Sequence, residues 1–293
     1  MVVPVILPRL ASIDDDLGYG ISEKDKINDK MDDFNHPRMR RAIIVNSLRD
    51  SRTDIRFEEG QKDLVSVKTI FEVYSEVQST DLIDFLTSGW EQWLKLGPSG
   101  WDPSGCLAES STTEKPPPFI LGNTPLHRIR NQRPSRHVLG KMGYFCTDTC
   151  TPVFDDLVQE MCEDAAIIKT AVTRCLAISG VVYALPTHPG HHAAEDSFGG
   201  YCYLNHAAAC ARLLQEKHKK VAILDVDYYC GNGTASIFAT DDSVLVVSLH
   251  CDPDHEYPFH NGFEDENNKS LCHLPKPPGT DWSSYKVSLE RGI

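Results

Sequence analysis

The sequence predicts an α/β fold built on a mainly parallel sheet that is flanked by helices. Two apolar runs, at 180–185 and 221–227, are bounded by turn residues, and a third run follows at 244–250. Short runs of this kind are typical of buried parallel strands. Helical spacing over 204–217 separates the first two runs. The order strand, loop, helix, strand predicts that these two strands lie in one parallel sheet.

The remaining elements follow from the same spacing rules. We expect an opening strand at 2–7 and helices at 36–47, 80–94, 154–178 and 282–290. Either Ser79 or Thr80 could supply the N-cap of the second of these helices. The polar segment 14–33 and the segment 97–118, which is rich in Gly, Pro and Ser, predict long surface loops.

Composition excludes several classes of protein. The formal net charge of −13 argues against general affinity for nucleic acid. An acidic surface would steer cationic substrates such as polyamines or basic tails, although the same charge also serves solubility alone. Ten cysteines occur without a Cys-x-x-Cys pair, which favours a reducing location, cytoplasmic or nuclear. The first residues do not form a signal peptide, and no apolar run is long enough to span a membrane.

Alternating aspartates end the second strand. Asp225, Asp227 and Tyr229 would share one face if the extended geometry continues past Asp227. In open α/β sheets, ligands bind beyond the carboxyl ends of the strands. Two carboxylates there require a metal or a cationic partner, although a lone Asp at a strand end often only caps a turn. With a histidine pair upstream and Gly-Asn-Gly downstream, the pattern favours a metal-assisted hydrolase.

The histidine pair, His191 and His192, follows Pro-Gly and therefore lies on a turn. Adjacent histidines point in different directions, so they suit general acid–base work better than joint binding of one ion. A surface pair without function is the alternative. Asp225 or Asn232 could orient the rings, and a ring held by Asn would be less basic than one held by Asp.

Three motifs resemble those of the histone deacetylase superfamily, nearest to acetylpolyamine amidohydrolases and class II histone deacetylases. They are Pro-Gly-His-His-Ala at 189–193, Gly-Gly-Tyr-Cys-Tyr-Leu-Asn at 199–205 and Leu-Asp-Val-Asp-Tyr-Tyr-Cys-Gly-Asn-Gly-Thr at 224–234. Weaker similarity covers most of the rest of the chain. The resemblance implies an arginase/deacetylase-like fold, one such domain over 1–293 that is incomplete at its C-terminus, and zinc-dependent hydrolysis of acetyl-lysine or acetylpolyamine amides.

The resemblance also implies a role for each matching residue. The catalytic positions are His191, His192 (the general base), Asp225, which orients the first histidine, and Asn232, which orients the second. The substrate tunnel would include Gly200, Tyr201 and Cys202. Asp227 matches a ligand of Zn²⁺. A monovalent cation, K⁺, would bind at Asp225, Asp227, Ser248 and Leu249.

Two substitutions depart from the family pattern. Tyr229 stands where the family has a histidine zinc ligand, and a neutral tyrosine hydroxyl is a poor substitute. Cys230 replaces the next histidine, but strand alternation points it to the other side unless a bulge re-aims it. The family's second zinc-binding aspartate and its oxyanion-stabilising tyrosine belong to a later strand, past Ile293. Since a catalytic zinc needs three protein ligands, we expect a degenerate metal site.

Three hypotheses therefore stay open. The first is a deacetylase-superfamily protein whose hydrolysis of acetylated amines is impaired, which makes it a pseudoenzyme candidate. The second is a non-catalytic binding or scaffold subunit that keeps the fold. The third is an incomplete gene model or splice form of an active enzyme. The expected partners are acetylated lysine or acetylated polyamine if the chain is active, and a homodimer is kept as a candidate assembly; neither nucleic acid nor membrane is expected.

Overall fold

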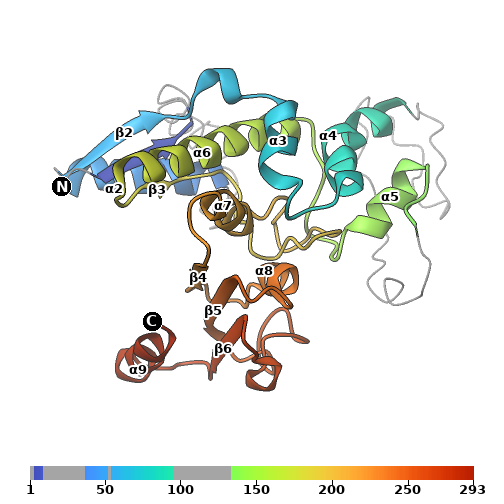
Figure 1. Cartoon of the computed structure of the whole chain (residues 1–293). Coiled ribbons are helices and arrows are strands. Elements are labelled where there is room, and N and C mark those ends of the chain that lie inside the picture. The colour runs from blue at the N-terminus through green and yellow to red at the C-terminus, as the bar shows by residue number, and fades with distance from the viewer. Residues whose placement is uncertain (1–2, 9–36, 52–53, 96–132) are drawn as a thin grey trace, which may run out of the picture.

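The strands form two three-stranded sheets in which every ladder is parallel. The computed structural model describes residues 3–8, 37–51, 54–95 and 133–293. The first sheet has the order β2 (Ile55–Glu59), β1 (Val3–Leu7), β3 (Tyr183–Ala184). The second has the order β4 (Val221–Asp225), β5 (Val244–Cys251), β6 (Leu271–Lys276). The predicted α/β architecture with a parallel sheet and flanking helices is confirmed (Figure 1).

The two sheets differ from the single sheet that the sequence predicted, because β3 and β4 are not paired. The run 180–185 forms a strand of two residues only. Pro186 has no N–H to donate to a ladder. The backbone N–H groups of Thr187 and His188 donate instead to the buried carboxylate of Asp164, at 2.6 and 3.4 Å. The chain is therefore held by a side chain directly after the predicted end of the strand at Leu185.

Five of the helices match predicted segments: α2 (Pro37–Ser51), α4 (Thr80–Lys95), α6 (Leu157–Ile178), α7 (His206–Gln215) and α9 (Trp282–Gly292). Of the two predicted caps for α4, Ser79 is the one whose Oγ accepts from the N–H of Leu82, at 3.3 Å. The elements that were not predicted are β2, β6, α3 (Val67–Tyr74), α5 (Val138–Phe145), α8 (Asn232–Phe238) and the 3₁₀ turns η3 (Lys62–Leu64) and η5 (Glu264–Glu266). Both predicted loops, 14–33 and 97–118, lie outside the described residues.

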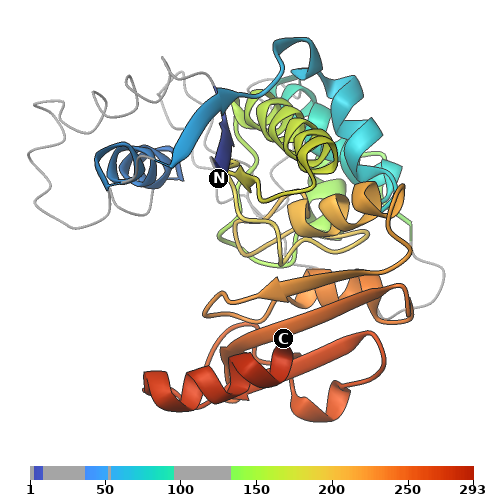
Figure 2. The same ribbon diagram turned by 60° about the vertical axis from the view of Figure 1, so that its left-hand side comes forward.

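The main core joins the two sheets through a layer of helices. Helix α7 contacts α6 on one side and β4 on the other, and Figure 2 shows it lying above the second sheet. Phe85 stacks on Phe145 and Phe198, with ring centroids 5.5 and 6.2 Å apart, in the centre of this core. None of the described helices combines the length and the apolar character needed to cross a bilayer. The candidate site lies where α8 and the loop after β3 meet the end of β4.

Candidate active site

Strand β4 ends at Asp225 and is followed by two successive turns. Oδ1 of Asp225 accepts from the N–H of Asp227 at 3.0 Å, and Oδ1 of Asp227 accepts from the N–H of Tyr229 at 2.9 Å. The predicted strand to residue 227 is therefore too long, because the aspartate side chains replace ladder hydrogen bonds with turns. The two carboxylates also differ in burial: the side chain of Asp225 is 13% exposed and that of Asp227 is 50% exposed.

His191 forms a partly buried pair with Asp225. Its Nδ1 donates to Oδ2 of Asp225 at 2.9 Å. Burial opposes a charge on the ring, but the hydrogen bond and the negative charge of Asp225 outweigh it and raise the pKa of His191. Burial likewise opposes a charge on the carboxyl, and the same hydrogen bond overcomes it and lowers the pKa of Asp225. The two shifts agree, since each partner favours the charged form of the other.

His192 is held by an amide instead of a carboxylate. Its Nδ1 donates to Oδ1 of Asn232 at 2.7 Å, which leaves Nε2 free of a proton and able to accept one. Burial, and then the charge of His191, lower the pKa of His192 to about 4. The two rings lie 4.0 Å apart between centroids. One histidine of the pair therefore favours the protonated state and the other favours the neutral state.

The segment 199–203 lies directly against His192. Gly200 has φ +56°, and a Cβ there would overlap the imidazole of His192, so the close approach requires glycine. Oδ2 of Asp148 accepts from the N–H of Gly200 at 2.5 Å and holds the segment in place. Cys202 is buried, whereas Tyr201 is 59% exposed. The structure thus brings these three predicted tunnel residues beside the histidine pair, and their role in binding substrate stays a prediction.

Tyr257 is a neighbour of His192 that the sequence reading missed. Its ring stands edge-on to His192, with centroids 4.8 Å apart, and burial raises the pKa of its hydroxyl to about 12. The bond between Tyr257 and Pro258 is cis. The sequence feature that could have drawn attention to Tyr257 is an aromatic residue directly before a proline in the loop after β5.

Tyr229 and Asp227 do not fit a catalytic zinc ion. The ring of Tyr229 lies 6.4 Å from His192 and 6.1 Å from Tyr257, between centroids. Within the described ranges, no group of three His, Cys, Asp or Glu donors close enough to share an ion includes Asp227. A catalytic zinc site takes three protein ligands and keeps one open position. The family's zinc chemistry therefore has no matching donor set at Asp227 in the described structure.

The predicted monovalent-cation positions are brought partly together. Ser248 pairs with Asp225 in the β4–β5 register, and both Ser248 and Leu249 are buried. The hydroxyl of Ser248 hydrogen-bonds to Nδ1 of His250 at 2.8 Å. Binding of K⁺ at this edge of the sheet stays a prediction.

Two carboxylates of α6, also missed by the sequence reading, support the turn that carries the histidine pair. Glu160 hydrogen-bonds to Nε2 of His188 at 2.6 Å, and Asp164 holds the backbone at residues 187 and 188. Both carboxylates are buried. Their spacing of four residues, which places them on the helix face that carries buried apolar residues, was the signal that could have revealed them.

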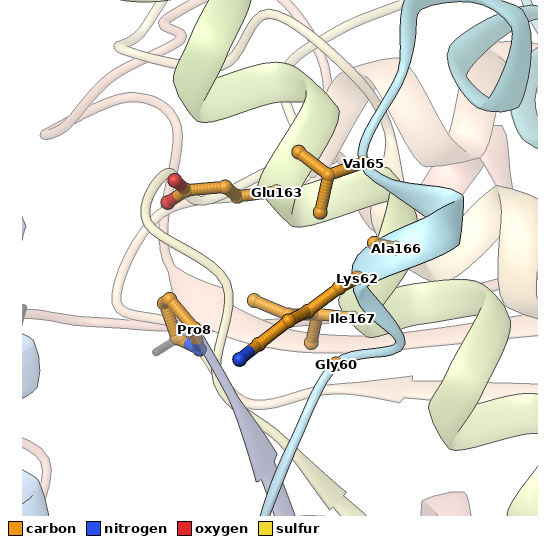
Figure 3. A pocket seen from close by; sticks show the side chains of 7 residues that line it. All are labelled: Pro8, Gly60, Lys62, Val65, Glu163, Ala166 and Ile167. Atoms are coloured by element: carbon orange, nitrogen blue, oxygen red, sulfur yellow. The ribbon is translucent and has the colours of Figure 1, made fainter. Parts of the chain in front are cut away.

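A cavity of about 250 Å³ lies elsewhere, where the ends of β1 and β2 meet α6 (Figure 3). It is lined by Pro8, Gly60, Lys62, Val65, Glu163, Ala166 and Ile167. None of these residues belongs to the candidate site.

Comparisons with known proteins agree with the motifs. Residues 120–293 match the histone deacetylase domain family. Acetylpolyamine amidohydrolase 2 from Pseudomonas aeruginosa is 31% identical over 229 residues, which cover 74% of this chain and 60% of that protein. Acetylpolyamine amidohydrolase from Mycoplana ramosa is 30% identical over 239 residues, covering 79% and 65%. This chain therefore spans about three fifths of the length of these relatives.

Solved structures show the same similarity in three dimensions. The crystal structure of acetylpolyamine aminohydrolase from Burkholderia pseudomallei superposes with a TM-score of 0.71 at 27% identity, covering 87% of this chain and 68% of that one. A histone deacetylase homologue from Aquifex aeolicus gives a TM-score of 0.58 at 17% identity, covering 99% and 63%, which supports the fold alone. The chain thus has the arginase/deacetylase fold, belongs to the histone deacetylase domain family and is similar to the acetylpolyamine amidohydrolases.

Proposed function

We propose that this protein recognises an acetylated amine, on lysine or on a polyamine, and that its amide hydrolysis is strongly impaired. The single observation that carries the proposal is Tyr229. It stands at the position of a histidine ligand, and Oδ1 of the neighbouring Asp227 is bound to the N–H of Tyr229 itself. The histidine pair, in contrast, keeps a partly buried hydrogen-bond partner for each ring.

The retained residues are suited to handling protons next to an amide. His192 presents an unprotonated Nε2 at neutral pH, so it can take a proton from a nucleophile. His191, favoured in its charged form by Asp225, can donate a hydrogen bond to a carbonyl oxygen. In the family the zinc ion supplies the activated water, and this donor set does not provide for it.

The substrate class rests on charge and on the relatives. The formal net charge of −13 attracts cationic ligands over long range. The relatives from Pseudomonas aeruginosa and Mycoplana ramosa are named acetylpolyamine amidohydrolases. A polyamine that is acetylated at one end keeps positive charge at the other. It therefore combines an acetylated amine with the positive charge that an acidic protein attracts.

Turnover of an acetyl-lysine peptide and of an acetylated polyamine tests the proposal. We expect no zinc-dependent turnover by the native 293-residue chain, and none by Tyr229→His, because that change adds one ligand to Asp227 where three are needed. Tyr228→His, at the adjacent exposed position, is the matched control. Binding of both compounds is measured by calorimetry on the same samples.

Robust zinc-dependent turnover by the native chain would contradict the proposed impairment. Turnover that appears with Tyr229→His and not with Tyr228→His would show that the ligand substitution alone was responsible. Absence of binding to either acetylated compound would refute the recognition part of the proposal and favour a scaffold role.

A further inference from the structure

Three side chains that can bind a metal meet where the turn after β4 contacts β5 and β6. Cys230, His250 and His273 each offer one donor atom, and the three atoms lie within 4.8 Å of one another. Sγ of Cys230 is 3.8 Å from Nδ1 of His273. All three side chains are buried, at 0%, 3% and 1% exposure. A cluster of two imidazoles and one thiol in the interior is therefore already assembled.

The sheet explains why these residues meet. Ser248 and His273 are partners in the β5–β6 register, and His250 lies two residues beyond Ser248 on the same face. Cys230 enters from the turn after β4, where the sequence reading expected it to point away from the candidate site. It does so: Tyr229 packs toward His192 and Tyr257, while the adjacent Cys230 reaches His273.

Gly262 packs directly against two members of the cluster, Cys230 and His250. Gly262 has φ +99°, and a Cβ there would lie 2.7 Å from Sγ of Cys230 and 2.8 Å from Nε2 of His250. Its N–H donates to Oε1 of Glu266 at 3.0 Å, which fixes the loop over the donors. The backbone at residue 262 therefore approaches the sulfur and the ring nitrogen so closely that a side chain there would not fit.

The donors are in states that suit a metal ion of intermediate softness. Burial lowers the pKa of both His250 and His273, so the imidazoles are neutral and able to act as ligands. Burial raises the pKa of Cys230 to about 12, so the thiol keeps its proton unless a cation replaces it. Asp225 and Glu266 place negative charge near the sulfur and would offset part of the charge of a bound ion.

We propose that Cys230, His250 and His273 form a binding site for one Zn²⁺ ion, separate from the family's metal position at Asp227 and Tyr229. A thiolate and two imidazoles are a preferred donor set for Zn²⁺, with distances of about 2.3 Å to sulfur and about 2.0–2.1 Å to nitrogen. Tetrahedral donors at those distances are roughly 3.5 Å apart, so the side chains need to converge by about 1 Å from their present separations.

The proton balance of binding is simple. Nε2 of His250 donates to the carbonyl of Gly262 at 2.9 Å, so Nδ1 accepts from the hydroxyl of Ser248. When Nε2 turns to the ion, its proton moves to Nδ1, and the Ser248 hydroxyl becomes the acceptor of that bond. The Ser248 hydroxyl proton is then directed at Sγ of Cys230, with which Ser248 already interacts. Only the thiol proton leaves the protein, so one proton is released for each Zn²⁺ bound.

The site would connect three segments that are distant in the sequence: the turn after β4, the end of β5 and the middle of β6. A bound ion would stabilise the second sheet because it binds the folded state and not the dispersed donors. It would supply no activated water to His192, since Cys230 and Tyr229 point to opposite sides of the turn.

Cobalt(II) binding to the metal-free full chain is the first test. We expect one equivalent of Co²⁺ to give thiolate-to-cobalt charge-transfer absorption, together with the intense visible bands of tetrahedral cobalt, and Zn²⁺ to displace it. Cys230→Ser should abolish the charge-transfer band, and His273→Asn should weaken binding by more than about tenfold.

Two matched controls separate this site from its surroundings. Cys272→Ser removes a thiol from the other face of β6, where Cys272 packs against the cluster of Val247, Leu249 and Leu274, and should leave the cobalt spectrum unchanged. Asp227→Asn removes the one ligand that the family position retains and should also leave it unchanged. Circular dichroism of each metal-free variant confirms that it is folded.

X-ray absorption of the zinc-loaded native chain needs no variant. One sulfur and at least two imidazole nitrogens around the ion would support the proposal, even if Cys230→Ser does not fold. A shell of oxygen and nitrogen alone, a charge-transfer band that survives Cys230→Ser in folded protein, or loss of the metal in Asp227→Asn would overturn it. So would failure of the native chain to bind Co²⁺ or Zn²⁺.

Discussion

The histidine pair and the turn that follows β4 are neighbours, yet they are built very differently. Each ring of the pair has a partly buried hydrogen-bond partner at 2.7–2.9 Å, and Gly200 and Tyr257 pack closely on His192. In the turn, the side chain of Asp227 is half exposed and the ring of Tyr229 is 37% exposed. The proton-handling residues are therefore more closely packed than the family's metal position, although Asp225 contacts both, through Oδ2 to His191 and through Oδ1 to the N–H of Asp227.

Acid should affect the histidine pair most strongly, through His192. Folding lowers its pKa from an ordinary 6.5 to about 4, so below 6.5 the unfolded chain takes up a proton that the folded chain does not. The free energy of unfolding should therefore fall by about 3 kcal/mol from neutral pH to about pH 4, and recover as pH rises. Chemical denaturation of the native chain and of His192→Gln measures the His192 contribution as the part of the acid dependence that the variant loses. The part that remains comes from other groups, such as His250 and His273, whose pKa burial also lowers.

His191→Gln is the control for this experiment because the contribution of His191 to the free energy of unfolding changes with pH in the opposite direction. The raised pKa of His191 gives stability that is complete below its ordinary value and is lost as pH rises through the raised value. An acid dependence that persists unchanged in His192→Gln would show that His192 is not held neutral by burial.

Removing the carboxylate charge should destabilise the folded chain more at Asp225 than at Asp227. Asp225→Asn keeps an oxygen for the turn but loses the charged partner of His191, and we expect a loss of about 1.5–3 kcal/mol in the free energy of unfolding. Asp227→Asn makes the same chemical change at a half-exposed position, and we expect less than about 0.5 kcal/mol. Both are measured with a chelator present. Equal losses of free energy of unfolding in the two variants would mean that the greater burial of Asp225 does not make its charge more important for stability.

A methyl group at Gly200 should destabilise the protein through contact with His192, and we expect this contact to cost less free energy of unfolding than the loss of the Asp225 charge. Gly200→Ala and Gly279→Ala both place alanine at positive φ, which costs about 1–2 kcal/mol at either position. A Cβ at Gly279 meets nothing within 4 Å, whereas at Gly200 it meets His192. The excess loss for Gly200→Ala, about 1 kcal/mol or more, reports this contact. An NMR titration should show a changed environment for His192 in Gly200→Ala alone.

The sequence predicted the helices and strands with strong periodicity better than it predicted how the sheets join. Helices α6 and α9 follow from apolar spacing, and β5 from a mainly apolar run. Between β3 and β4 the backbone of Thr187 is bound to Asp164, a buried carboxylate 23 residues earlier, and no local pattern shows such a contact.

The candidate site was likewise predictable in part. The motifs indicated which residues would meet, and Asp225 and Asn232 do lie beside the rings. The cluster of Cys230, His250 and His273 was missed, because it depends on the β5–β6 register and β6 was not predicted. A strand that contains a proline and a lysine has no clear period, so its histidine could not be placed on a face.

The pairing of β1 has a consequence for how the chain emerges from the ribosome. Val5 is matched with Phe57 on one side and with Tyr183 on the other. At about 5–20 residues per second, synthesis of the intervening segment up to Tyr183 takes roughly 10–35 seconds. During that time one edge of β1 has no β3 to pair with, and its apolar residues are available to other nascent chains. Strand β1 therefore waits longer for its second neighbour than β5 does, because both partners of β5 lie close to it in the sequence.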